Sequence, residues 1–153
     1  MSRVAFVAGI SAVIGICAVA VVFAVSGGYD WYLHRSEETS SYKTAAEAKA
    51  DRSSFPRWVP DGATGVEYKM KTTGGARLLR ATLPSASLPA DCSPYKAAAN
   101  LPGPELKAGW FPGDVADKPT ARCGVYYAYL DGNTLYGWQS HTDWVAENKA
   151  SQR

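Results

Sequence analysis

Few residues of this chain have the type and spacing that catalysis requires. His141 and Asp143 follow a run typical of a β-strand, and a histidine held by a carboxylate can serve as a general base. No G-x-S-x-G motif supplies a nucleophile beside them. The alternative is a surface histidine that hydrogen-bonds a local turn. We predict no catalytic residue, and we keep His141 and Asp143 as a polar pair that a hydrolase or a glycan-binding module would use.

Known cofactor and metal signatures do not occur in the sequence. It has no phosphate-binding glycine loop, no dinucleotide fingerprint and no zinc-ligand spacing. The neighbouring acids Glu37 and Glu38 stand in a polar stretch typical of a solvated segment. The sequence therefore predicts no metal ligand and no cofactor.

Two of the three cysteines are candidates for a disulfide. Cys17 lies in an apolar stretch near the start of the chain, whereas Cys92 and Cys123 lie far from it. Two cysteines in a domain outside the cytoplasm most simply form a bridge. We therefore predict a Cys92–Cys123 disulfide, with two free buried thiols as the alternative.

The second half of the chain is rich in aromatic side chains. Tyr126 and Tyr127 are neighbours in a predicted strand, so they must point to opposite faces of the sheet. One face would then present a surface for a protein, peptide or glycan. The alternative is that loops and helices cover both faces. The candidate binding surface consists of Trp110, Phe111, Tyr126, Tyr127, Tyr129, Tyr136 and Trp138.

A long apolar stretch determines where these groups would be displayed. Val4–Ser26 contains no charged residue, and a helix of that length spans about 30 Å, the hydrocarbon thickness of a bilayer. We predict a transmembrane helix that contacts lipid, with residues 1–28 forming a cytoplasmic tip and the span. The alternatives are a cleavable signal peptide, a lipoprotein signal ending at Cys17, and a buried core helix.

Charge gives the expected orientation and argues against one class of partner. The short N-terminal tip carries Arg3 and no acid, which favours a cytoplasmic N-terminus and an extracytoplasmic C-terminal domain at a bacterial plasma membrane. Without Arg3, the chain has 15 basic and 14 acidic residues. This balance disfavours nucleic acid as a partner, because nucleic-acid binders need a clustered basic face.

Beyond the anchor, the pattern predicts one small α+β domain over residues 42–146, built on two antiparallel hairpins. In the first, Val66, Tyr68 and Met70 alternate with charged residues, and the return strand directs Arg77 inward. In the second, residues 124–130 and 134–140 flank the turn Asp131-Gly132-Asn133.

One or two short helices complete the expected domain. Thr44 and Glu47 form a capping box for a helix over residues 42–51, and Pro94 favours a second helix over residues 95–99. We expect residues 29–41 to be a polar connector next to the membrane. Residues 147–153 read as a flexible tail.

The first helix and the turn after it carry a family resemblance. The string Tyr42–Asp51, followed by Arg57-Trp58-Val59-Pro60 and Ala63-Thr64, resembles bacterial membrane-anchored proteins with a YbbD head domain. The resemblance covers residues 42–72 and implies no established chemistry.

Together these patterns predict a protein that recognises another protein without catalysing a reaction. It would act as an accessory subunit of a membrane complex or as a protective or immunity factor of the envelope. The alternative is an envelope hydrolase or a glycan-binding module.

Overall fold

The computed structural model describes residues 36–95, 101–115, 118 and 120–153, and Glu37–Arg153 form one compact unit. The predicted membrane span Val4–Ser26 lies outside the described residues. Within the described part of the chain, no helix is both long and apolar enough to cross a bilayer.

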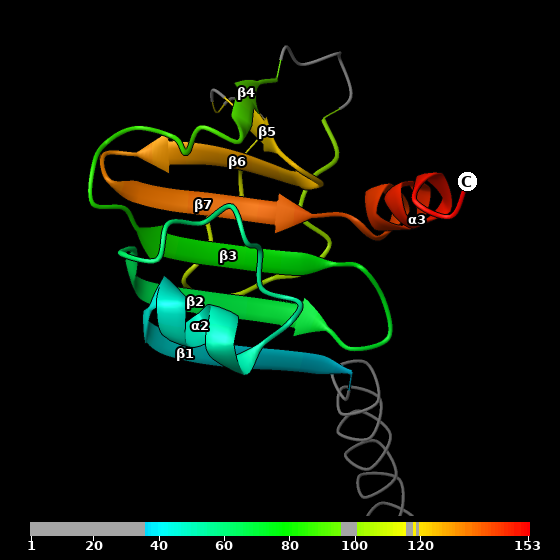
Figure 1. Cartoon of the computed structure of the whole chain (residues 1–153), viewed down its shortest axis with the longest axis horizontal. Helices are drawn as coiled ribbons and strands as arrows, with labels where there is room; N and C mark the ends of the chain where they lie inside the picture. The colour runs from blue at the N-terminus through cyan, green and yellow to red at the C-terminus, as the bar shows by residue number, and fades with distance from the viewer. Residues whose placement is uncertain (1–35, 96–100, 116–117, 119) are drawn as a thin grey trace, which may run out of the picture. The chain divides into compact units, whose positions relative to one another are not determined.

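A single antiparallel sheet of seven strands organises the domain, in the order β1-β2-β3-β7-β6-β5-β4 (Figure 1). Two helices accompany it within the described residues, so the predicted α+β class with an antiparallel sheet is confirmed. The strands are β1 Glu37–Thr44, β2 Thr64–Lys71, β3 Arg77–Thr82, β4 Cys92–Pro94, β5 Ala121–Cys123, β6 Tyr126–Asp131 and β7 Thr134–Gln139. The helices are α2 Ala45–Asp51 and α3 His141–Ala150.

The first hairpin has the predicted alternation. Tyr68 of β2 faces Leu79 of β3, and Met70 faces Arg77. Arg77 points inward as expected and is 9% exposed. Its Nη1 donates hydrogen bonds to the carbonyl oxygens of Gly74 and Ala76, at 3.1 and 3.3 Å. These two carbonyls accept hydrogen bonds from the Arg77 guanidinium, which is buried in the sheet and largely removed from water.

The second hairpin is also confirmed. Asp131 pairs with Thr134, which leaves Gly132 and Asn133 as the two-residue turn. Gly132 has φ +58, a left-handed conformation that glycine adopts without a steric penalty. The two hairpins join through β3 and β7, which pair from Arg77–Gln139 to Thr82–Thr134.

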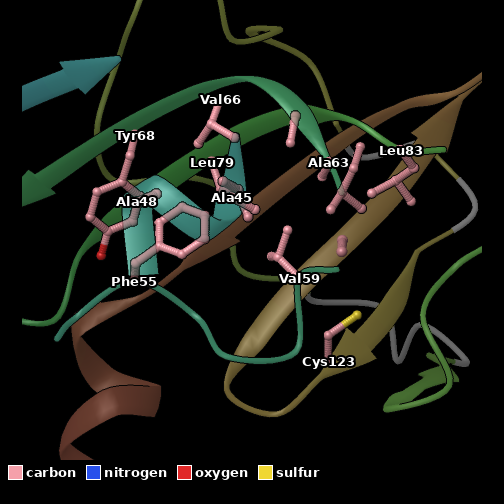
Figure 2. Close-up of a cluster of buried hydrophobic side chains, with 13 residues drawn as sticks. Ala45, Ala48, Phe55, Val59, Ala63, Val66, Tyr68, Leu79, Leu83 and Cys123 are labelled. Atoms are coloured by element: carbon pink, nitrogen blue, oxygen red, sulfur yellow. The ribbon is translucent and has the colours of Figure 1, made fainter. Parts of the chain in front are cut away.

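Apolar side chains cover both faces of the sheet. On one face, Ala45 and Ala48 of α2, with Phe55 and Val59 of the following loop, pack on the strands (Figure 2). On the opposite face, the connection between β4 and β5 contributes Leu106, Phe111 and Val115 to a cluster with Leu78, Tyr127, Tyr129 and Trp138. The central strands β3, β6 and β7 are therefore buried on both sides.

Four expectations about the chain's segments need correction. Residues 37–41, expected in a connector, belong to edge strand β1, which pairs with β2 from Glu37–Lys71 to Thr44–Thr64. A polar sequence can form such a strand because its backbone hydrogen bonds need no apolar side chains. The first helix begins at Ala45, after the predicted Thr44 cap, whose hydroxyl accepts from the Glu47 N–H at 3.2 Å.

The other corrections concern the later helices. Cys92–Pro94 form β4, and residues 96–99 of the helix expected over 95–99 lie outside the described residues. At the C-terminus, α3 extends to Ala150, so four of the seven residues of the expected tail are helical.

Candidate functional site

The predicted disulfide is present. Cys92 of β4 and Cys123 of β5 face each other across the two strands and are bonded, with their Cα atoms 4.2 Å apart. The bridge spans a sequence separation of 31 residues, and closing such a loop stabilises a fold by about 4 kcal/mol on chain-entropy grounds. The disulfide secures the short strands at this edge of the sheet.

The structure separates the roles of His141 and Asp143. Ser140 caps α3, and its hydroxyl donates a hydrogen bond to the Asp143 carboxylate at 2.8 Å. Asp143 also forms an ion pair with Arg122 at 3.5 Å. His141 instead accepts the Gly75 N–H on Nδ1 at 3.1 Å. His141 and Asp143 thus make two different structural contacts. The turn that His141 bonds lies between β2 and β3, 66 residues away, whereas the alternative expected a local turn.

The aromatic surface expected from the sequence is mostly core. Five of its seven residues are buried: Phe111, Tyr126, Tyr127, Tyr129 and Trp138. Tyr127 stacks on Trp138 with ring centroids 5.5 Å apart, beneath the loop that carries Phe111. Trp110 and Tyr136 are partly exposed. The expectation of an exposed face was wrong for the five, because segments distant in sequence cover both faces.

A groove of about 460 Å³ lies at one end of the sheet, on the face that α2 covers. Three segments form it: the loop after α2, the ends of the central strands, and the first turn of α3. Its lining residues are Ser53, Ser54, Phe55, Pro56, Arg57, Trp58, Arg77, Gly124, Val125, Tyr126, Gln139 and Trp144. We call this feature the α2-face groove.

One cross-strand row supplies the polar residues of the sheet to the groove. Arg77 of β3 lies opposite Gln139 of β7. Because Tyr127 lies opposite Trp138, the preceding residue Tyr126 comes next in the same row. The Gln139 amide donates to the Gly75 carbonyl, so its orientation is fixed. The sheet register thus brings together residues from three strands.

Two buried polar atoms of the groove residues lack a hydrogen-bond partner. They are the Tyr126 hydroxyl and the indole Nε1 of Trp58. The rings of Tyr126 and Trp58 meet edge to face, with centroids 5.8 Å apart. Burial raises the pKa of Tyr126 well above its usual value, and the neighbouring Tyr68 adds to the rise. A tyrosine hydroxyl is protonated at neutral pH and can donate a hydrogen bond.

The charge in the α2-face groove is positive. Arg57 is exposed and donates through Nη1 to the Lys49 carbonyl at 2.9 Å, which holds the side chain against α2. The hydrogen bonds of Arg77 go to backbone carbonyls, and no carboxylate among the described residues forms an ion pair with it. No Asp, Glu or His belongs to the lining residues named above. The groove can therefore receive a group that accepts hydrogen bonds or carries negative charge.

Two glycines let α3 approach and place Trp144 at the groove. A Cβ on Gly75 would lie 2.3 Å from the Trp144 Cβ, and one on Gly74 would lie 3.1 Å from the His141 Nδ1. Trp144 is 36% exposed and stacks on His141 with centroids 5.9 Å apart. Because no residue of α3 is buried, this first turn carries its attachment to the domain.

Sequence reasoning missed most of the α2-face groove. Of its residues, only Tyr126 was a candidate, and it was assigned to a different surface. The inward position of Arg77 was the available signal, since a strand that buries an arginine needs a polar site to receive it.

Comparison with known proteins adds no relative. No known protein family, curated protein or solved structure matches this chain. The resemblance to YbbD head domains stays a prediction.

Proposed function

We propose that this chain is a single-pass membrane protein of a bacterial plasma membrane, with a cytoplasmic N-terminus. Its disulfide-bonded domain would bind a protein partner outside the cytoplasm without catalysing a reaction. The chain would act as an accessory subunit of a membrane complex or as a protective or immunity factor of the envelope. The apolar stretch Val4–Ser26 and the Cys92–Cys123 bridge support the location.

The observation that carries the binding role is the lining of the α2-face groove. It combines aromatic walls with hydrogen-bond donors, including two buried donors that have no hydrogen-bond partner in the part of the chain that the structure describes. Burying an unpaired polar group costs about 1–3 kcal/mol, and a bound partner that supplies acceptors removes this cost. The groove residues therefore suit recognition, whereas His141 and Asp143 are engaged at the start of α3.

Copurification from membranes tests the binding role. The full-length chain, tagged at its C-terminus, is extracted in mild detergent, and bound proteins are identified by mass spectrometry. We expect one protein to copurify with the wild type in an amount close to that of the chain itself. The same amount should copurify with Lys107→Glu, because this charge change lies on the opposite face of the sheet. Arg57→Glu should lose this partner. Absence of any stoichiometric partner would contradict the proposal.

Thiol labelling of intact cells tests the location. A membrane-impermeant maleimide should label the chain only after a reductant has opened the bridge, and it should react at Cys92, which is partly exposed, before the buried Cys123. Free labelling without reductant would show that the bridge does not form in the cell. Failure to label after reduction, while a lysed sample labels, would place the domain on the other side of the membrane.

A further inference from the structure

We propose that the α2-face groove binds an acidic peptide segment of the partner, with an apolar or aromatic residue next to the acid. The carboxylate of the peptide would pair with Arg57 and Arg77, and its backbone would accept hydrogen bonds from Tyr126 and Trp58 once these two buried side chains turn toward the groove. This inference rests on the proposed function and names the chemistry that the groove recognises.

The unpaired donors define the first requirement. The Tyr126 hydroxyl and the Trp58 indole are neutral groups, and both are buried in the free protein. A peptide chain presents a carbonyl acceptor at every residue, and these acceptors must themselves be paired when they leave water. Two neighbouring neutral donors therefore match an extended peptide backbone.

The arginines define the second requirement. Arg77 is buried, and one of its guanidinium nitrogens, Nη1, donates to two backbone carbonyls. Arg57 likewise uses one nitrogen on the Lys49 carbonyl. A guanidinium has further donors in a planar fork that matches a carboxylate. A bound carboxylate would give Arg77 the counter-charge that the described residues lining the groove do not supply.

The size and walls of the groove define the third requirement. The groove has a volume of about 460 Å³ and is wide open to solvent, so an extended segment can enter it from outside. Phe55, Trp58, Val125 and Trp144 provide apolar wall area. An apolar or aromatic side chain beside the acid would pack on these walls and gain from leaving water.

Selection from a random peptide library tests the inference. The full-length, oxidised protein in detergent is presented to hexapeptides displayed on phage, and enriched sequences are synthesised with a fluorescent label. We expect Asp or Glu at one fixed position next to an apolar or aromatic residue. Fluorescence anisotropy then gives the affinity of the enriched peptide for each variant.

The variants separate the groove from the rest of the surface. Arg57→Glu should weaken binding at least tenfold, and a peptide with Lys in place of the acid should recover part of that loss. Tyr126→Phe should weaken binding about threefold to tenfold, whereas Lys107→Glu should change it less than twofold. Enrichment without acids, or no enriched peptide, would overturn the inference. An unchanged affinity in Tyr126→Phe would overturn the role of that hydroxyl and leave it a water-binding group only.

Failure of this inference is distinguishable from failure of the proposed function. A partner that copurifies equally with Arg57→Glu and wild type would remove the groove as the site while leaving protein recognition in place. Acidic peptides that bind the groove, with no protein recovered from membranes, would leave the groove chemistry in place and remove the proposed partner.

Discussion

Tyr126 and Tyr68 are two buried phenols on the same face of the sheet with different hydrogen bonding. The Tyr68 hydroxyl donates to the Ser54 carbonyl at 2.9 Å, whereas the Tyr126 hydroxyl, which lies near Tyr68, meets no acceptor or donor with hydrogen-bond geometry among the described residues. A satisfied buried hydroxyl stabilises the folded state, while an unsatisfied one destabilises it. The contrast between these two residues makes the unpaired donor measurable in the free protein.

We expect Tyr126→Phe to leave the free energy of unfolding unchanged or to raise it, because the lost hydroxyl made no hydrogen bond. Tyr68→Phe is the matched control and should lower it by about 1 kcal/mol. Urea denaturation of the oxidised protein, followed by tryptophan fluorescence, measures both. Equal losses in the two variants would show that the Tyr126 hydroxyl is paired in the folded protein.

The raised pKa values of Tyr127 and Tyr129 predict that the free energy of unfolding falls at alkaline pH. Burial raises the pKa of each to about 12, from a usual value of about 10. Between these values the unfolded chain has released protons that the folded chain still holds, so unfolding becomes easier as pH rises. Stability from this source is complete below about pH 10 and is lost as pH approaches 12.

Denaturation at several pH values from 9 upward, for about an hour each, measures this effect. We expect the free energy of unfolding to fall across the window, and the fall to be smaller in Tyr127→Phe combined with Tyr129→Phe. A slope that is the same in wild type and in this double variant would contradict the assignment to these two side chains.

At the scale of elements, the turn between β2 and β3 supports the start of α3. Gly75 donates its N–H to His141 and lies against the Trp144 side chain, so the turn fixes both residues. The capping by Ser140 and Asp143 begins the helix at the same place. The position of Trp144 at the α2-face groove therefore depends on a glycine turn distant in sequence.

Replacing Gly75 by alanine should displace α3 while the sheet stays folded. The added Cβ would come within 2.3 Å of the Trp144 Cβ, so the helix must move. Hydrogen exchange with mass spectrometry should show faster exchange over residues 144–150 and little change in β3 and β7. Gly109→Ala is the control, because an added Cβ there meets nothing within 4 Å. Unchanged exchange over α3 would contradict this account of its attachment.

Some of these elements followed from the sequence and others did not. The hairpins were predictable because alternation and the Gly132-Asn133 turn are local signals, and the inward Arg77 followed from the same alternation. Strand β1 was missed because Glu37–Ser41 is polar, and an edge strand is specified by its partner's backbone.

The α2-face groove was missed for a different reason. Arg57, Trp58, Arg77 and Trp144 come from three separate segments, and only the strand order brings them together. The burial of Tyr127 and Trp138 could not be predicted from local sequence patterns either. The loop that covers them is distant in sequence, and only long-range packing places it over these side chains.

At the scale of the whole domain, the two ends of the sheet differ in character. The end with the turn at Gly132 and Asn133 carries exposed polar residues, whereas the opposite end of the hairpin holds the α2-face groove. If the partner binds at the α2-face groove, it should contact only the end of the sheet that holds the groove. Ser53 is an exposed residue lining the groove, and Asn133 is an exposed residue at the other end.

Site-specific photo-crosslinking in living cells tests this claim most directly. A photoreactive amino acid replaces Ser53 in one full-length variant and Asn133 in another, and light-dependent adducts are detected by immunoblot. We expect an adduct with one protein from position 53, lost when Arg57→Glu is added, and none from position 133. Adducts from position 133 alone, or none from either position, would contradict the account.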